Sequence, residues 1–198
     1  MLNVTDHHFL LSAASIIFNP LFWNIVARKE YESKLVTNIF GSSKKGCYGL
    51  GITIFSLGLL RDYLYKVALM NQPVLYSSTP LLLKVLSFSI IFAGNVLVLS
   101  SMYKLGFVGT YLGDYFGFLM DEMITSFPFN VCDHPMYIGS TLSFFGVALY
   151  YGSPAGMVLT ALVYLCYQVA SKYELEFTTK IYSKVTKTKL ESSKPKKL

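Results

Sequence analysis

The sequence predicts an all-α integral membrane protein, a helical bundle with about five membrane-embedded helices. Of its 198 residues, 53% are hydrophobic and only 14% are charged, and the mean hydropathy is +0.47. Soluble domains carry considerably more charge. Several apolar runs approach the roughly 20 residues that a helix needs to cross a bilayer. The formal charge of +6 is concentrated outside these runs, which favours anionic lipid headgroups as partners and excludes a nucleic-acid-binding face.

The first apolar run covers residues 9–27 and is interrupted by Asn19, Pro20 and Asn24. Polar groups in a lipid-facing helix need partners, so the sequence leaves open whether this helix crosses the bilayer. Residues 1–8 contain no Lys or Arg, unlike the basic region of a cleavable signal peptide, and we expect the helix to be retained. A charged loop is predicted over residues 28–46.

Two further helices are predicted over residues 46–60 and 81–102. Lys84 lies near the start of the later one, where a long side chain can reach the interface. The next segment, residues 104–133, is rich in aromatic and acidic residues, and its glycines recur at every fourth position: Gly109, Gly113 and Gly117. This spacing fits either close packing against another backbone or a re-entrant connection between helices.

The last apolar run, residues 138–170, is too long for one crossing. As a single helix it would extend about 48 Å at 1.5 Å per residue, against a hydrocarbon core of ~30 Å. Gly152, Ser153 and Pro154 supply a break, because proline blocks helix continuation and disfavours helical geometry in the residue before it. We therefore predict that the last two helices form a hairpin broken near Pro154, with both ends of the run on one side of the membrane.

Basic residues indicate which side this is, because Lys and Arg near helix ends favour the cytosol. The segment after residue 177 is rich in lysine, with Lys180, Lys184, Lys187, Lys189, Lys194, Lys196 and Lys197. The carboxyl terminus is therefore predicted to be cytosolic. Counting back through the hairpin and the two preceding helices also places residues 28–46 in the cytosol, in agreement with their basic side chains.

The two ends of the hairpin carry a candidate site. His134 begins the run, followed by Tyr137, and Glu174 ends it. Ionisable groups at the borders of a membrane-length apolar run are costly to hold near lipid, so they indicate function. A carboxylate, a histidine and aromatic rings suit a reaction between a soluble cationic cofactor and a lipid headgroup, since aromatic faces attract cations. The three cysteines and three histidines match no metal-ligand spacing, so no metal site is predicted.

Five segments carry a resemblance to a known family. They are residues 22–28 (FWNIVAR), 96–101 (VLVLSS), 109–117 (GTYLGDYFG), 127–130 (FPFN) and 135–137 (PMY). In order and spacing the chain resembles the phosphatidylethanolamine N-methyltransferases from residue 18 to residue 182. It resembles most the fungal members that methylate phosphatidyl-N-methylethanolamine.

The resemblance implies an enzyme that transfers methyl groups from S-adenosyl-L-methionine to a phospholipid headgroup. Its expected substrates are phosphatidyl-N-methylethanolamine and phosphatidyl-N,N-dimethylethanolamine, and its product is phosphatidylcholine. The implied location is the endoplasmic reticulum membrane, spanned several times, and a mitochondrial membrane is left open as a second location. The oligomeric state and the first methylation of phosphatidylethanolamine also stay open.

The cofactor motifs of this family are a Gly-x-Gly in the third helix and a Glu-Glu pair after the last one. By position they fall on residues 92–94 and 174–175, where only Gly94 and Glu174 keep the motif residue. The cofactor contacts implied are Phe92, Ala93, Gly94, Glu174 and Leu175, to which Tyr137 is added as an aromatic face. Glu176 is a candidate replacement for the lost carboxylate, although it points to a different face of a continuing helix.

Glu174 and His134 are the predicted catalytic residues. We expect Glu174 to anchor a cationic or hydroxyl group of the cofactor, while His134, or a water beside it, relays the proton of the amine. The alternative for Glu174 is a solvated charge at a helix end. The alternative for His134 is a residue that caps the helix beginning at Pro135, because proline is common at the first helical position.

The expected organisation is one membrane-embedded methyltransferase domain, residues 1–182, and a basic cytosolic tail, residues 183–198. Lys194 and Lys196 in that tail resemble a dilysine retrieval signal. Two other functions stay open. One is an isoprenylcysteine carboxyl methyltransferase, which shares the His-Pro-x-Tyr pattern. The other is a non-catalytic lipid-binding or scaffold protein in the membrane.

Overall fold

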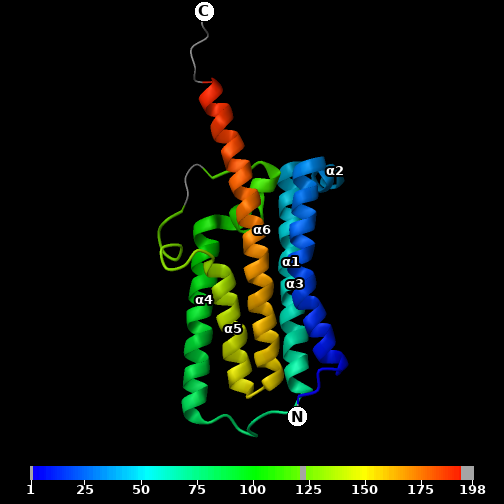
Figure 1. Ribbon diagram of the computed structural model, residues 1–198, viewed down its shortest axis with the longest axis vertical. Helices are drawn as coiled ribbons and strands as arrows, with labels where there is room; N and C mark the ends of the chain where they lie inside the picture. Colours follow the sequence, from blue (N-terminus) through cyan, green and yellow to red (C-terminus); the bar gives the residue numbers. More distant parts are fainter. Residues whose placement is uncertain (1, 121–123, 193–198) are drawn as a thin grey trace, which may run out of the picture.

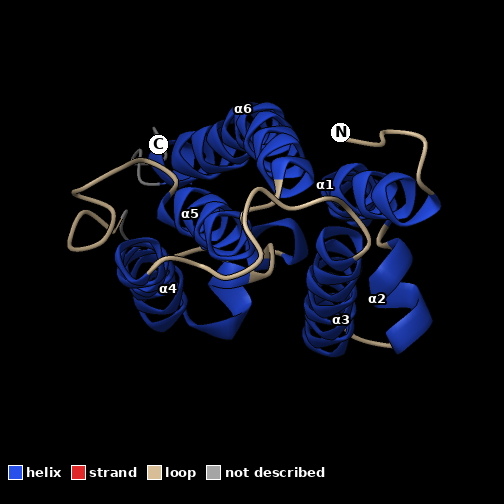
Figure 2. Ribbon diagram, turned by 90° about the horizontal axis from the view of Figure 1, so that it is seen from below, coloured by secondary structure: helices blue, strands red, loops and turns tan. Residues whose placement is uncertain are grey.

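The computed structural model describes residues 2–120 and 124–192, with side chains up to Ser183, and over these residues the protein is helical (Figure 1). The expected all-α fold is confirmed. Its elements are α1 (His7–Ser33), α2 (Leu35–Phe40), α3 (Ser43–Met70), α4 (Leu81–Thr110), the 3-10 helix η1 (Gly113–Phe116), α5 (Pro135–Tyr151) and α6 (Pro154–Ser192). The five long helices run along one axis, and Figure 2 shows α5 between α4 and α6.

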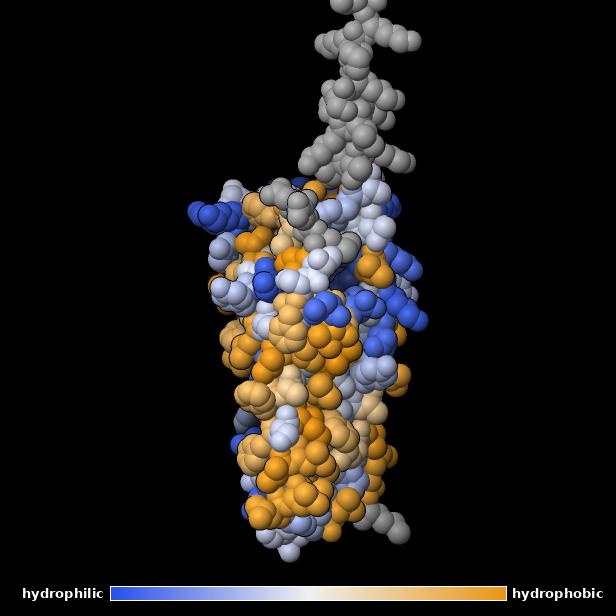
Figure 3. Space-filling view, turned by 90° about the vertical axis from the view of Figure 1, so that its left-hand side faces the viewer, coloured by the Kyte–Doolittle hydropathy of each residue, from blue (hydrophilic) through white to orange (hydrophobic). Residues whose placement is uncertain are grey.

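Three of the described helical stretches are long and apolar enough to cross a membrane: His7–Ser33, Leu81–Phe116 and Pro154–Ser183. The predicted membrane protein is therefore supported, while the expected number of about five embedded helices stays a prediction. Figure 3 shows a broad apolar surface, with hydrophilic residues gathered toward the end from which α6 extends. On α4 this surface includes the exposed side chains Leu81, Leu82, Phe92 and Leu99.

α1 is one continuous helix, because its polar residues find partners inside the bundle. Asn19 Nδ2 donates to the carbonyl of Leu57 on α3 at 3.1 Å, and Asn24 Nδ2 donates to that of Pro20 at 3.1 Å. At its start, the side chain of Asp6 accepts a hydrogen bond from Phe9 N, which holds the pKa of that carboxyl below its ordinary value. The buried residues of α1 recur every three or four positions, as expected for one face of a helix.

The prediction of a loop over residues 28–46 is wrong, because this segment is largely helical. α1 continues to Ser33, α2 follows at once, and α3 begins at Ser43. Glu30, which is fully buried, organises the turn: its Oε2 accepts from the backbone N–H groups of Val36 and Thr37 at 2.8 and 2.9 Å. Its Oε1 accepts from Thr37 Oγ1 at 2.5 Å. A carboxylate thus satisfies the free donors at the start of α2.

Replacement of Glu30 by Gln should lower the free energy of unfolding by about 1–3 kcal/mol. The amide has one oxygen that accepts hydrogen bonds instead of two, so buried donors are left unpaired. Thermal unfolding of the purified protein in detergent, followed by circular dichroism, would measure this. Glu32→Gln is the matched control, since Glu32 is exposed two residues away. Equal melting temperatures for the two variants would contradict the role of Glu30.

α4 and α5 approach each other through glycine. A Cβ atom built on Gly94 would lie 2.4 Å from the carbonyl oxygen of Gly139, and one built on Gly139 would lie 2.4 Å from that of Gly94. The glycine repeat noted in the sequence does not contact another helix in this way. A Cβ atom built on Gly109 or Gly113 would lie nearest to Leu105 or Val108 of the same segment. Close packing between helices therefore depends on Gly94 and Gly139 and not on that repeat.

The predicted hairpin is confirmed. α5 ends at Gly152, whose φ of 57° is left-handed, and Pro154 begins α6. Ser153 Oγ accepts from Gly156 N at 3.1 Å and so satisfies a free donor of the new helix. His134 at the start of α5 and Glu174 on α6 consequently lie toward the same end of the bundle (Figure 1). α6 continues through the expected domain boundary, and the lysines at 194, 196 and 197 lie outside the described residues.

α4 bends where it reaches this end of the bundle. Gly106 has a φ of 63° and a ψ of 179°, a conformation open to glycine but strained for other residues. The bend turns the last residues of α4 across the bundle, toward η1 (Figure 1). Asp114 of η1 then accepts from Thr178 Oγ1 on α6 at 3.0 Å, which joins η1 to the hairpin.

Candidate active site

Glu174 is held by hydrogen bonds from two other helices. Its Oε1 accepts from Trp23 Nε1 at 2.7 Å and from Asn24 Nδ2 at 3.2 Å, both on α1. Tyr137 on α5 donates its hydroxyl to Oε1 and Oε2 at 2.8 and 2.7 Å. Hydrogen bonds that a carboxylate accepts favour its ionised form and fix its position. The structure thus holds the Glu174 carboxyl group in one position where α1, α5 and α6 meet.

Aromatic rings surround this carboxylate. The ring of Tyr137 stacks on that of Tyr167, with centroids 4.5 Å apart and planes at 15°. Trp23 lies 6.4 Å from each of the two tyrosine rings. Aromatic faces attract sulfonium and alkylammonium ions, by about 0.5 to 2 kcal/mol. A carboxylate with aromatic walls is therefore suited to a cationic ligand.

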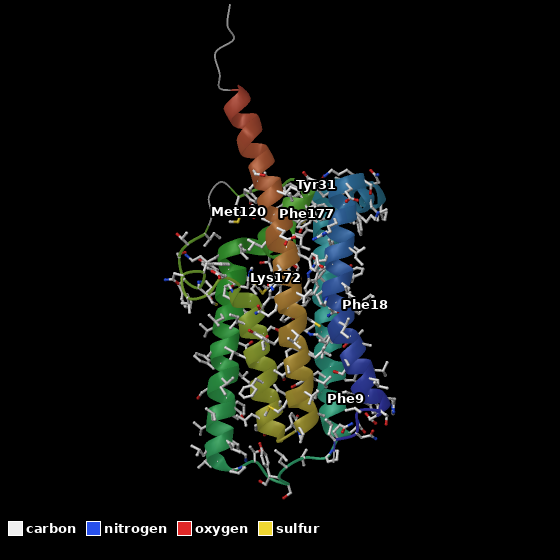
Figure 4. All side chains as sticks on the ribbon, viewed as in Figure 1. Phe9, Phe18, Tyr31, Met120, Lys172 and Phe177 are labelled. Atoms are coloured by element: carbon white, nitrogen blue, oxygen red, sulfur yellow. The ribbon has the colours of Figure 1, made fainter. Side chains whose placement is uncertain are left out.

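An aromatic layer lies above Glu174 along α6. Phe177 stacks on Tyr115 of η1 at 4.9 Å and contacts Tyr31 of α1 edge-on at 5.2 Å, and Figure 4 labels Tyr31 and Phe177 at this level. Farther along, Tyr182 accepts a hydrogen bond from the backbone N–H of Met120, also labelled in Figure 4. These contacts pack η1 and α1 against α6 beside the Glu174 site.

The site opens into a cavity of about 570 Å³, within the range of small-molecule sites. Its polar end includes Asp114, His134, Tyr137 and Glu174. Its other end is apolar and is lined from α3 and α4 by Ile54, Phe55, Leu59, Val98, Met102 and Leu105. One cavity therefore joins charged and aromatic groups to a surface suited to acyl chains.

His134 lies at the N-cap of α5, where its side chain makes no capping hydrogen bond. Its position is the helix-entry position that the alternative expected, with its carbonyl accepting from Tyr137 N and Ile138 N. Its ring centroid is 6.1 Å from that of Tyr137, so Tyr137 stands between His134 and Glu174. A second cavity of about 340 Å³ shares His134, Tyr137 and Tyr167 with the first, and extends between α5 and α6. His134 is thus accessible from both cavities.

Comparison with known proteins decides the family. A model of the family described as phospholipid methyltransferase matches residues 82–185. The chain belongs to this family. It is 55% identical to the phosphatidyl-N-methylethanolamine N-methyltransferase of Emericella nidulans, over 94% of this chain and 91% of the relative. For the enzyme of that name in Saccharomyces cerevisiae the identity is 54%, over 91% of this chain and 88% of the relative.

A mammalian relative covers the chain equally well. The phosphatidylethanolamine N-methyltransferase of Mus musculus is 46% identical over 90% of this chain and 89% of the relative. No solved structure matches. The family resemblance seen in the sequence is therefore confirmed, and membership of a methyltransferase family implies a methyl donor.

The structure brings together some of the predicted site residues and not others. Glu174, Tyr137 and His134 line the larger cavity. Phe92 and Leu175 are 72% and 59% exposed. The other residues of the first motif do not line either cavity described above: Ala93 is exposed, and Gly94 is buried where α4 meets α5. Their contact with a cofactor stays a prediction; in the structure Phe92, Ala93 and Leu175 are exposed and Gly94 contacts α5.

Asp114 lines the cavity with Glu174, together with Asp62 and Asp133, whereas the sequence suggested Glu176 as a further carboxylate. Glu176 is exposed and does not line the cavity. Asp114 lines it, and its oxygens accept from Thr178 Oγ1 at 3.0 Å and from Tyr115 N at 3.1 Å. Asp114 is 60 residues from Glu174 in the sequence, so the sequence did not indicate that both line one cavity. The only signal was an acidic residue inside the glycine-rich segment that carries the family resemblance.

Trp23 and Asn24 were also missed as site residues, although they belong to a segment that carries the resemblance. The signal was Asn24, a polar residue within an apolar run. Its Oδ1 is buried without a hydrogen-bond partner among the described residues, while its Nδ2 donates to Glu174. Arg28, one turn farther along α1, donates to the carbonyl of Tyr173 at 3.1 Å and lies 5.2 Å over the ring of Phe177.

Candidate metal ligands and thiols also occur among the described residues. The described part of the chain holds no group of three or more His, Cys, Asp or Glu side chains that could bind a metal ion. Cys132 lines the smaller cavity, where burial and then the neighbouring Asp133 raise the pKa of its thiol. A thiol with a raised pKa is protonated at neutral pH and is a weak nucleophile.

Proposed function

We propose that this protein methylates phosphatidyl-N-methylethanolamine and phosphatidyl-N,N-dimethylethanolamine, using S-adenosyl-L-methionine, to give phosphatidylcholine. The observation that carries the proposal is the Glu174 carboxylate, held by Trp23, Asn24 and Tyr137 at the polar end of a cavity whose other end is apolar. A substrate with a cationic headgroup and two acyl chains has the same polarity. The names of the relatives support the same reaction.

The methyl donor supplies a carbon already activated by its sulfonium, so the protein needs no covalent nucleophile. The fit is supported by a carboxylate with aromatic walls and by the unpaired Oδ1 of Asn24, all suited to a cation. We assign the donor's cationic end to Glu174, Trp23 and Tyr137. Their task is alignment, which can lower a barrier by about 7 to 11 kcal/mol at best.

The amine must lose a proton before its nitrogen can attack the methyl carbon, because an alkylammonium with a pKa of about 10.4 is mostly protonated at neutral pH. The nitrogen then forms the new bond to carbon while the carbon–sulfur bond breaks. We propose that Glu174 and Asp114 hold the ammonium by charge. His134, which is reached from both cavities, accepts the proton directly or through water and passes it to the solvent.

We place the active site at the cytosolic face of the endoplasmic reticulum membrane, with a mitochondrial membrane as a second location. The support is the excess of lysine after Phe177 and the basic residues near α2, at the same end of the bundle (Figure 1). In sealed vesicles, an impermeant cysteine reagent should label a cysteine placed at exposed Lys44 but not one placed at exposed Ser78. Labelling at Ser78 alone would reverse the orientation.

The function is tested in membranes of a host without phospholipid methyltransferases of its own. Membranes containing the protein are incubated with S-adenosylmethionine labelled in its methyl group and with each of the two lipids. Label in phosphatidylcholine is the expected result. Label in a prenylcysteine methyl ester would favour the isoprenylcysteine enzyme, and the absence of transfer from folded protein would favour a lipid-binding protein.

A further inference from the structure

Arg61 is a buried cation that the proposed chemistry does not use. It lies on α3 and is 9% exposed, and it is one of the residues that line the larger cavity. Its Cζ atom is 4.8 Å from the centre of the Phe144 ring. A charge held among apolar helices in a membrane is costly and by default marks a ligand or ion site. The alternative is that Arg61 serves only as the partner of Asp62 in a structural ion pair.

The hydrogen bonds of Arg61 leave part of its guanidinium free. Nε and Nη2 donate to Asp62 Oδ1 at 3.0 and 2.8 Å, and Nη1 donates to the hydroxyl of Tyr167. A guanidinium has five N–H groups, so one remains on each Nη nitrogen. Asp62 neutralises the charge only in part, because its side chain is 55% exposed. Two adjacent N–H donors are the arrangement that binds two oxygens of one anion.

Arg61 and Glu174 line the same cavity, and two stacked tyrosine rings connect them. The Cζ atom of Arg61 is 6.0 Å from the ring centre of Tyr167, and that ring stacks at 4.5 Å on Tyr137, which donates to Glu174. α3 ends and α6 begins at the same end of the bundle (Figure 1). Counted at about 1.5 Å per residue, Arg61 is closer to that end than Glu174, and its guanidinium reaches the Tyr167 hydroxyl.

We propose that Arg61 binds the phosphodiester of the phospholipid substrate. This inference rests on the proposed function, in which the amine lies beside Glu174. In an aminophospholipid, two carbons separate the amine from the phosphate, and the acyl chains follow. Each group of the lipid then has a partner in this one cavity: Glu174 for the amine, Arg61 for the anion, and the apolar side chains of α3 and α4 for the acyl chains.

A phosphate subsite at this position fixes how far the headgroup enters the cavity. Arg61 is itself held by the Tyr167 hydroxyl and by the Phe144 ring, so the anion is bound at a set depth. The methyl donor carries a carboxylate but no phosphate, so its KM in the Arg61 variants separates the two anions. With the phosphodiester at Arg61, the subsite selects phospholipids over other lipids that carry an amine.

The test compares Arg61→Gln, Arg61→Lys and Asp62→Asn in mixed micelles. Arg61→Gln should raise KM for phosphatidyl-N-methylethanolamine about 10- to 100-fold, the effect of losing charge-assisted hydrogen bonds. KM for S-adenosylmethionine should stay unchanged. The lipid KM of Arg61→Lys should lie between those of the wild-type protein and Arg61→Gln, because lysine keeps the charge and loses the paired donors. Asp62→Asn is the control for the ion pair: KM for the lipid should stay the same or fall, since a competing anion is removed.

Binding can be read without methyl transfer, because Trp23 is the only tryptophan of the chain and lines the cavity. A phospholipid with brominated acyl chains should quench its fluorescence more strongly than a brominated analogue without the phosphate, and Arg61→Gln should abolish this preference. If the wild-type protein shows the preference but transfers no methyl group, the proposed function fails and the subsite stands. Equal rises in KM for Arg61→Gln and Asp62→Asn, or a preference that survives Arg61→Gln and Arg61→Lys, would overturn the subsite.

Discussion

Replacement of Glu174 by Gln is expected to lower kcat/KM for methyl transfer about 100-fold or more, the range found for essential acid–base or charge-stabilising groups. The carboxylate accepts hydrogen bonds from Trp23, Asn24 and Tyr137, and an amide of the same shape supplies only one acceptor and no charge. The side chain lies near the end of the bundle, while α5 and α6 are joined along their length by packing. The variant should therefore remain folded.

Glu176→Gln is the matched control for this experiment. Glu176 is exposed on the same helix and does not line the cavity, so its loss should change kcat/KM less than twofold. Initial rates at several concentrations of lipid and of S-adenosylmethionine, with circular dichroism to verify folding, give the comparison. Turnover by Glu174→Gln equal to that of Glu176→Gln would remove Glu174 from the active site.

Replacement of Gly94 by Val is expected to prevent α4 from packing on α5, and Gly94→Ala to lower the free energy of unfolding by about 3 kcal/mol or more. The Cβ atom would lie 2.4 Å from the carbonyl oxygen of Gly139 and 2.7 Å from Ser143 Oγ. Backbone atoms of a packed helix cannot move aside as the end of a flexible side chain can. The melting temperature of the purified protein in detergent measures the effect.

Gly58→Ala is the control, because a Cβ atom on Gly58 meets no atom within 4 Å. Alanine is a better helix former than glycine by about 1 kcal/mol, so this variant should melt at the same or a higher temperature. The same measurements separate packing from cofactor binding at Gly94. A Gly94→Ala protein with unchanged melting temperature and a raised KM for S-adenosylmethionine would contradict the packing role and support the motif assignment.

The hairpin shows what could be predicted from local properties. The length of the apolar run, set against the thickness of a bilayer, required a break, and Pro154 located it because proline cannot continue a helix. The same argument brought His134 and Glu174 to one end of the bundle. For residues 28–46 the same kind of reasoning gave a wrong prediction. The charges suggested a loop, but Glu30 is buried and accepts a hydrogen bond from a backbone N–H at the start of α2. A buried carboxylate cannot be recognised from composition.

The sequence by itself determined the membrane setting, the helical class, the hairpin and, through its motifs, the family, and it made Glu174 a candidate site residue. These depend on hydrophobic length, on breakers and on residues matched one by one. Only the tertiary structure decided that Trp23, Asn24 and Tyr137 hold Glu174, that Asp114 and not Glu176 lines the cavity with it, and that Arg61 lines the same cavity. Each of these contacts joins helices distant in the chain, and such pairings arise from packing, which no local pattern encodes.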